Sequence, residues 1–100
     1  MKKYEKLEKF DPNSLKLVSD SIHTFLQALG EDTQREGLLK TPERYAKAMH
    51  FLTQGYEMDA LQIMKSALFE EHHNQMVIVK DIELFSLCEH HLLPFYGRAH

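Results

Sequence analysis

The sequence of 100 residues lacks tryptophan and contains one cysteine, three prolines and four glycines. A single cysteine excludes an intrachain disulfide, so its thiol is expected to be a buried side chain, a nucleophile or a metal ligand. No apolar run approaches the roughly 18 residues that a membrane helix needs. The polar start at residues 1–6 lacks the apolar core of a secretory signal. These absences predict a cytoplasmic protein with no membrane partner.

The charge is small and evenly distributed. The formal net charge is -3, and charged residues make up 27% and hydrophobic residues 43% of the chain, as in ordinary globular proteins. Basic residues form no stripe, so nucleic acid is not expected as a partner. A chain of this length suits one small domain or part of a larger one.

The first predicted helix has recognisable signals at both ends. Asp11 is a candidate cap, Pro12 suits the first helical position, and Gly30 is a natural stop. Between them, apolar residues recur at steps of three and four, which indicates one apolar stripe along the helix. These residues are Leu15, Val18, Ile22, Phe25, Leu26 and Leu29.

Two more helices are predicted before residue 70. Thr41 is expected to cap the second, with Pro42 in its first turn and Gly55 at its end. Asp59 is expected to cap the third. Residues 70–74 are polar and predict a break between the helices and the last quarter of the chain.

That last quarter has the composition of strands. Met76–Phe85 is rich in branched residues and alternates in its second half, which predicts a strand, and residues 95–100 predict the start of another. Pro94 fits an edge or turn position. The expected organisation is a helical region at residues 1–74, then a strand, a ligand-bearing turn and a second strand at residues 75–100.

The connection between these strands carries Cys88, Glu89, His90 and His91. The spacing of Cys88 and His91 can bring a sulfur and a ring nitrogen to one metal ion in a tight turn, as in many zinc sites. Because neighbours in extended backbone point to opposite sides, a division of roles is expected: His91 binds metal while His90 transfers protons. Glu89 can orient a histidine or a bound water.

A catalytic zinc site usually has three protein ligands and one open position. The local candidates for a third ligand are His72, His73 and His100, although His72 and His73 are also typical of a solvated loop pair. His23 and His50 lie in predicted helices and are expected at the surface or rim. Two further interpretations of Cys88 stay open, a buried structural thiol and a nucleophile paired with histidine.

Two blocks of the sequence resemble a known family. The first, Ser-x-Cys-Glu-His-His followed by Leu-Pro-Phe-x-Gly, stands at Ser86 to Gly97. The second, Arg-Glu-Gly-Leu-x-x-Thr-Pro-x-Arg-x-Ala-x-Ala, stands at Arg35 to Ala48, and the strand lead-in Val-Lys-Asp-Ile begins at Val79. In their order and spacing they resemble GTP cyclohydrolase I, the zinc enzyme of the tunnelling fold.

The resemblance implies an activity and site roles. The family converts GTP and water to 7,8-dihydroneopterin triphosphate and formate, the entry to folate and other pterins. Carried over residue by residue, Cys88 and His91 are the expected zinc ligands, and His90 is the catalytic histidine that handles protons at the purine imidazole ring. Glu89 is expected to support the zinc water or to hold the turn.

Basic residues of the second block are expected to bind the triphosphate. Arg44 and Lys47 lie one helical turn apart and so share a face, and the resemblance implies that they help to hold the phosphates, which arginine can bind bidentately. The alternative interpretation is a solvated helix face.

The resemblance also implies an α+β fold of amino-terminal helices followed by the first strands of a tunnelling-fold (T-fold) antiparallel sheet, truncated within the second strand. The family's third zinc ligand, a second cysteine, and its guanine-binding carboxylate are expected beyond residue 100. Family members form toroidal homo-oligomers, typically decamers, with active sites between subunits. The isolated chain is therefore expected to be inactive and prone to aggregate.

Two alternative functions remain. In a tunnelling-fold enzyme similar to the nitrile reductases, Cys88 is a covalent nucleophile, and it then alkylates readily rather than being shielded by zinc. In a non-catalytic helical assembly module, Cys88→Ser leaves function intact.

Overall fold

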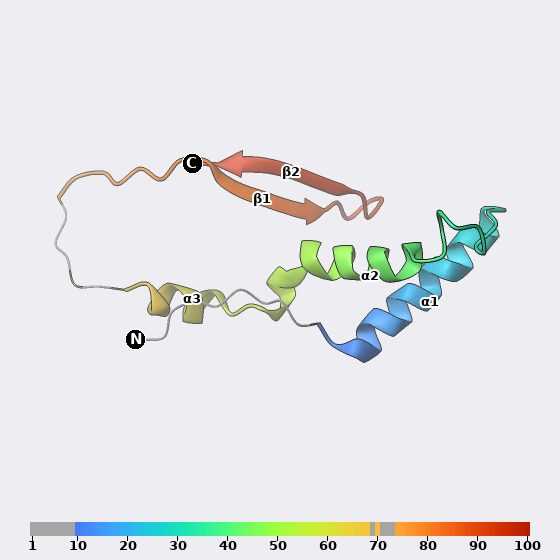
Figure 1. The fold of residues 1–100 in the computed structure, drawn as a ribbon. Coiled ribbons are helices and arrows are strands. Elements are labelled where there is room, and N and C mark those ends of the chain that lie inside the picture. The colour runs from blue at the N-terminus through green and yellow to red at the C-terminus, as the bar shows by residue number, and fades with distance from the viewer. Residues whose placement is uncertain (1–9, 69, 71–73) are drawn as a thin grey trace. The chain divides into compact units, whose positions relative to one another are not determined.

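A computed structural model describes residues 10–68, 70 and 74–100. These residues fall into two units that divide between Phe51 and Leu52, and each unit is described by itself. The architecture is α+β, with helices first and a two-stranded antiparallel sheet last (Figure 1). The elements are α1 (Pro12–Ala28), α2 (Thr41–Leu52), the 3-10 helix η1 (Gln54–Glu57), α3 (Ala60–Ser66), β1 (Ile82–Leu87) and β2 (Pro94–Ala99).

Helix α1 begins as predicted. The Asp11 carboxylate accepts a hydrogen bond from the Asn13 amide at 3.1 Å, and Pro12 occupies the first helical position. The cap satisfies one of the amides that the first turn leaves without a partner.

The end of α1 is also as predicted, and Gly30 is its cause. Gly30 has φ of 86°, which an L-residue with a side chain rarely adopts. Its amide donates to the Gln27 carbonyl at 3.0 Å, and the Glu31 amide donates to the Leu26 carbonyl at 3.1 Å. These two bonds are the paired contacts of a Schellman motif, so the last carbonyls of the helix are satisfied.

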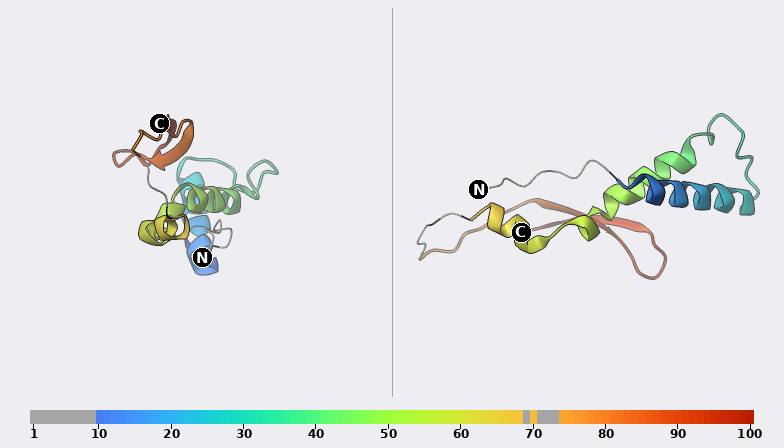
Figure 2. Two further views of the ribbon diagram at one scale, coloured as in Figure 1. Left: turned by 90° about the vertical axis from the view of Figure 1, so that its left-hand side faces the viewer. Right: turned by 90° about the horizontal axis from the view of Figure 1, so that it is seen from below.

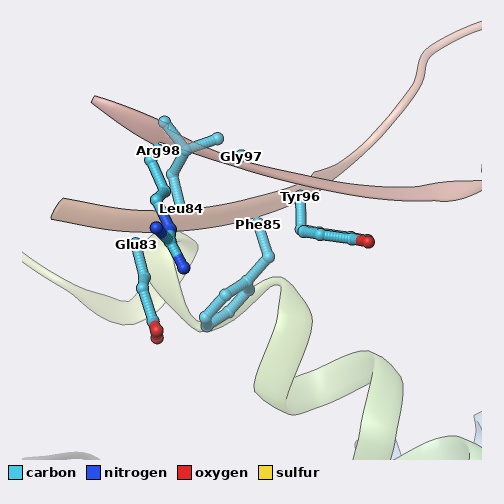
Figure 3. Close-up of a pocket in the computed structure, with 6 residues that line it drawn as sticks. All are labelled: Glu83, Leu84, Phe85, Tyr96, Gly97 and Arg98. Atoms are coloured by element: carbon cyan, nitrogen blue, oxygen red, sulfur yellow. The ribbon is translucent and has the colours of Figure 1, made fainter. Parts of the chain in front are cut away.

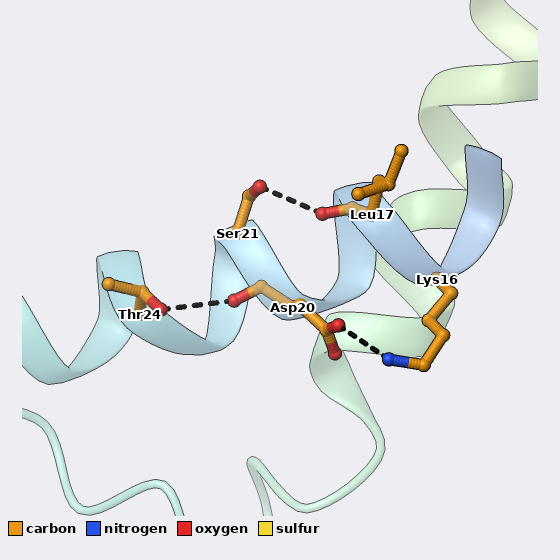
Figure 4. Close-up of polar contacts among 5 residues, drawn as sticks. All are labelled: Lys16, Leu17, Asp20, Ser21 and Thr24. Carbon is orange, nitrogen blue, oxygen red and sulfur yellow. Dashed lines mark hydrogen bonds and ion pairs between the residues drawn. The ribbon is translucent and has the colours of Figure 1, made fainter. Parts of the chain in front are cut away.

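Polar side chains on one side of α1 bond within the helix (Figure 4). The Ser21 hydroxyl donates to the Leu17 carbonyl at 2.8 Å, and the Thr24 hydroxyl donates to the Asp20 carbonyl at 3.2 Å. Lys16 pairs with Asp20 at 2.9 Å. All three contacts are exposed and local, so they contribute little to fixing the position of α1 against other elements.

Helix α2 differs from the prediction at both ends. Thr41 is its first residue, and its hydroxyl donates to the Gly37 carbonyl at 3.2 Å, whereas a cap would accept from an amide. The prediction of a Thr41 cap is therefore wrong. The helix ends at Leu52, and Gly55 lies within η1, so the predicted end at Gly55 is also wrong.

Helices α1 and α2 lie side by side in one unit (Figures 1 and 2), and a half-buried histidine links them. His50 Nδ1 lies 2.9 Å from the Ala46 carbonyl, and its Nε2 lies 2.8 Å from Ser14 Oγ. Because a carbonyl only accepts, Nδ1 carries the proton, and Nε2 accepts from the Ser14 hydroxyl. Ala46 is 1% exposed, and Pro42 of the same helix is also buried.

Helix α3 begins at the predicted cap. The Asp59 carboxylate accepts from the Leu61 amide at 2.9 Å and from the Gln62 amide at 3.2 Å. Its last residue is Ser66, so the helix has 7 residues. None of the helices in the described part of the chain has both the length and the apolarity that a bilayer span requires.

The two strands form an antiparallel hairpin. Ile82 pairs with Ala99 at one end and Leu87 pairs with Pro94 at the other. The predicted strand start at Met76 is wrong, because residues 74–81 are irregular and Asp81 has φ of 59°. No strand lies opposite residues 74–80 in the described part of the chain, and a ladder needs a partner to form.

Candidate functional site

The turn that joins β1 to β2 carries the predicted site residues. Two backbone hydrogen bonds close it: the Cys88 amide donates to the Leu93 carbonyl at 2.9 Å, and the Leu92 amide donates to the Cys88 carbonyl at 3.0 Å. Leu92 has φ of 54° and reverses the chain direction. The turn therefore holds Cys88 and His91 within one compact loop at the end of the sheet.

The sulfur of Cys88 accepts a hydrogen bond inside this turn. The Leu93 amide lies 3.4 Å from Sγ, and the side chain is half-buried. This amide, followed by that of His91, holds the pKa of the Cys88 thiol below its usual range, and burial opposes them more weakly. Donors to the charged form favour it, so the turn favours a thiolate, the form that binds metals and attacks electrophiles.

The two histidines lie next to each other on the exposed side of the turn. The ring centroids of His90 and His91 are 6.0 Å apart, and the ring planes are inclined by 34°. The rings are not stacked, so each can contact a different group. Glu89 is exposed beside them. This arrangement is compatible with one imidazole as a ligand and the other as a proton carrier.

A third metal ligand is missing from this cluster. Among the residues that the structure describes, no group of three or more His, Cys, Asp or Glu side chains could hold a metal ion. His72 and His73 lie outside the described residues. His100 lies at the opposite end of the hairpin, where its Nδ1 accepts from the Asp81 amide at 3.1 Å. Six strand residues separate it from Cys88, about 20 Å, which excludes it as a ligand in the same turn.

The predicted phosphate-binding residues lie on α2, in the other unit. Arg44 and Lys47 are both exposed, and Lys47 pairs with Glu43 at 3.1 Å. An exposed ion pair of this kind contributes little to stability and separates easily. Both cations can therefore reach a polyanion from one helix face.

Two pockets lie near the strands. One, of about 320 Å³, is formed within the hairpin and is lined by residues of both strands, including Glu83, Phe85 and Tyr96. Figure 3 shows Glu83 and Phe85 projecting from the same side of β1. A second of about 620 Å³ has Cys88 and Glu89 in its lining. The second is the one of chemical interest, because it contains the thiol.

Two features of the structure were not predicted from the sequence. His50 is half-buried, which agrees with the expected position at the surface or rim, but the engagement of both of its ring nitrogens was not predicted. Its partner Ser14 is 36 residues away, so no local pattern signals the pair. The Leu93 amide that contacts Cys88 is a backbone group, and residue type carries no sign of it.

Comparisons with known proteins agree with the resemblance seen in the sequence. A family profile described as GTP cyclohydrolase I matches residues 18–100. A protein of Bacteroides thetaiotaomicron named GTP cyclohydrolase 1 is 59% identical over 96 residues, which cover 96% of this chain and 48% of the relative.

Relatives from other organisms carry the same name. One from Porphyromonas gingivalis is 65% identical over 75 residues, covering 75% of this chain and 39% of the relative. One from Saccharomyces cerevisiae is 52% identical over 97 residues, covering 96% of this chain and 40% of the relative. The chain thus spans less than half the length of these three curated relatives.

Proposed function

The chain belongs to the GTP cyclohydrolase I family, and from this membership we propose that the full-length protein hydrolyses the purine ring of GTP to 7,8-dihydroneopterin triphosphate and formate. The observation that carries the proposal is the Cys88 turn. It places an amide-stabilised thiol beside two unstacked imidazoles. These are the groups that a metal-assisted hydrolase needs for binding an ion and for moving protons.

The donor set of the turn suits zinc. Thiolate sulfur and imidazole nitrogen are ligands that Zn²⁺ prefers, and the amide contacts favour the deprotonated thiol. Cys88 and His91 would hold the ion, with a third ligand, a cysteine, contributed from beyond residue 100. When bound, zinc supplies Lewis acidity and lowers the pKa of water towards neutrality.

The remaining residues of the turn have roles in proton transfer. His90 lies next to His91 on the exposed side of the turn, and imidazole is a common general acid and base in enzymes. It would hold and release the proton at the imidazole ring of the purine, which makes the ring carbon electron-poor and open to attack by water. Glu89 would orient water or stabilise the turn.

Arg44 and Lys47 would bind the triphosphate of GTP. Their shared position on the exposed face of α2 supports this, since two cations one turn apart can contact neighbouring phosphate oxygens. The full-length protein is proposed to act as a homo-oligomer, a decamer as in the family, with sites completed between subunits.

The test is a set of variants of the full-length protein. Zinc content is measured by elemental analysis, and turnover by formate release together with pterin fluorescence. Cys88→Ser and His91→Gln are expected to lose zinc and turnover, whereas His90→Gln keeps zinc and loses turnover. His23→Gln, on α1, is the matched control and keeps both. Wild-type protein with zinc but without formate release from GTP contradicts the proposed reaction.

The lowered pKa of Cys88 favours a second candidate function. In that alternative, Cys88 is the covalent nucleophile of an enzyme similar to the nitrile reductases, since a low thiol pKa is also a property of nucleophiles. The two functions differ in their response to zinc. A ligand thiolate becomes protected from iodoacetamide when zinc is added, while a nucleophile reacts at the same rate with or without zinc.

A further inference from the structure

We propose that the backbone amide of Leu93 is a positioning group that donates a hydrogen bond to the metal-bound thiolate of Cys88. The inference rests on the proposed function, because it assumes that Cys88 is a zinc ligand. It goes beyond that function by assigning a role to a residue whose side chain has no metal-binding chemistry.

The first argument is the geometry of the closed turn. The Leu93 amide lies 3.4 Å from Cys88 Sγ, within range for a bond to sulfur. The Leu93 carbonyl accepts from the Cys88 amide at 2.9 Å, so both backbone groups of Leu93 face Cys88. The position of the sulfur relative to the backbone is thereby fixed before any metal binds.

The second argument is the conformation of Leu92. Its φ of 54° lies in the left-handed region, which leucine rarely adopts. Its side chain is 66% exposed, so burial of the leucine does not account for the conformation. Backbone strain of this kind persists where the surrounding structure requires it. Here the turn brings the next amide, that of Leu93, to the sulfur.

The third argument concerns what such a donor does for a ligand. Groups that hydrogen-bond to metal ligands orient them and tune their electron density. A donor to the thiolate stabilises negative charge on sulfur and holds its lone pairs in a fixed direction.

The experiment replaces single amides by esters in the full-length protein. Leucic acid, the hydroxy analogue of leucine, is introduced by translation at position 93 or at position 92. At position 93 the ester removes the donor to Sγ, whereas at position 92 it removes the 3.0 Å bond to the Cys88 carbonyl and leaves the sulfur contact. Leu93→Ala is a second control, because it keeps the amide and removes a side chain that is 62% exposed.

The readouts are zinc affinity, by chelator competition, and the thiolate-to-metal charge-transfer band of the Co²⁺-loaded protein. The ester at 93 is expected to move the band to longer wavelength, because sulfur lone pairs lose their stabilising donor, and to weaken zinc binding about 10-fold. The ester at 92 and Leu93→Ala leave the band in place. If the Leu93 amide only stabilised the turn, both esters would change the band and the zinc affinity to a similar extent.

Two results overturn the inference and differ from each other. An unchanged band and zinc affinity in the ester at 93 show that the amide does not act on the thiolate, while the zinc site stands. A wild-type protein with no thiolate-to-Co²⁺ band shows that Cys88 is not a ligand, and the proposed function fails with the inference.

Discussion

The reactivity of one side chain, Cys88, decides what the turn can do. The Leu93 and His91 amides lower the pKa of its thiol and burial raises it more weakly. A lowered pKa means that the thiolate persists to a lower pH than in free cysteine. Metal binding and alkylation both require that form, so both report on the same backbone contacts.

The first prediction is a pH profile. In the metal-free full-length protein, the rate of Cys88 alkylation by iodoacetamide is expected to rise with pH, with a midpoint below the usual pKa of a cysteine thiol. In urea, the midpoint is expected to return to the usual pKa of a cysteine thiol, because unfolding removes the amide donors. Because the full-length protein is expected to contain a further cysteine, the peptide carrying Cys88 is followed separately by mass spectrometry. Equal midpoints in native and unfolded protein contradict the role of the turn.

At the scale of elements, the ends of α1 and the contact between α1 and α2 are set by a few backbone and side-chain groups. Two glycines allow the effect of backbone conformation on stability to be separated from the effect of steric crowding. A Cβ at Gly30 or at Gly55 meets no atom within 4 Å, but only Gly30 has positive φ. A difference between alanine substitutions at these sites thus reports conformation rather than crowding.

The second prediction uses this pair. Gly30→Ala is expected to lower the free energy of unfolding by about 1 kcal/mol, the cost of placing a side chain in the left-handed region. Gly55→Ala, the matched control, is expected to change it little. Urea unfolding of the full-length protein measures both. Equal effects at the two sites would show that the positive φ of Gly30 does not determine the stability of this helix end.

The third prediction concerns the contact of Ser14 with His50. Ser14→Ala leaves Nε2 without its 2.8 Å donor in a half-buried position, which is expected to cost about 1 kcal/mol. In a double-mutant cycle with His50→Ala, the two losses should be less than additive, because they remove one shared bond. Ser21→Ala, which removes a hydroxyl that bonds to the Leu17 carbonyl of its own helix, is the control. Additive losses in the cycle contradict a direct Ser14–His50 contribution.

The predictability of these elements from sequence depends on whether their determinants are local. The caps at Asp11 and Asp59 and the stop at Gly30 are predictable, because each acts through residues two or three positions away. The role of Thr41 is not, because its hydroxyl bonds to the carbonyl of Gly37 in the preceding loop. The strand predicted from Met76 is wrong for a non-local reason, since a strand exists only where a partner stands opposite.

In the candidate site, too, the sequence predicts some features and not others. The residue types in the turn at Cys88 indicate metal and proton chemistry directly from the sequence. The donor from Leu93 to sulfur and the left-handed Leu92 are properties of the folded backbone, and residue type does not reveal them. Zinc, the third ligand and the triphosphate contacts stay predictions.

At the scale of the whole molecule, the described residues bury very little. The buried ones among them are Ala46, Pro42 and Thr33. Large apolar side chains are exposed on helices and strands alike, and Tyr96 of β2 is 91% exposed. Folding stability comes largely from apolar burial, and a two-stranded sheet is marginal on its own. A chain with this much exposed apolar surface is expected to associate or to be only marginally stable.

The fourth prediction comes from that shortage of burial. The 100-residue chain by itself is expected to bind the dye ANS, to sediment as aggregates and to unfold without a sharp thermal transition, since its exposed apolar side chains favour association. The full-length protein is expected to show a cooperative transition and little ANS binding, because the proposed assembly covers the same side chains. Sedimentation velocity and calorimetry of the two proteins, side by side, make the comparison. A monomeric 100-residue chain with a sharp transition would show that its own contacts are sufficient for folding, and that the uncovered sheet does not need a partner.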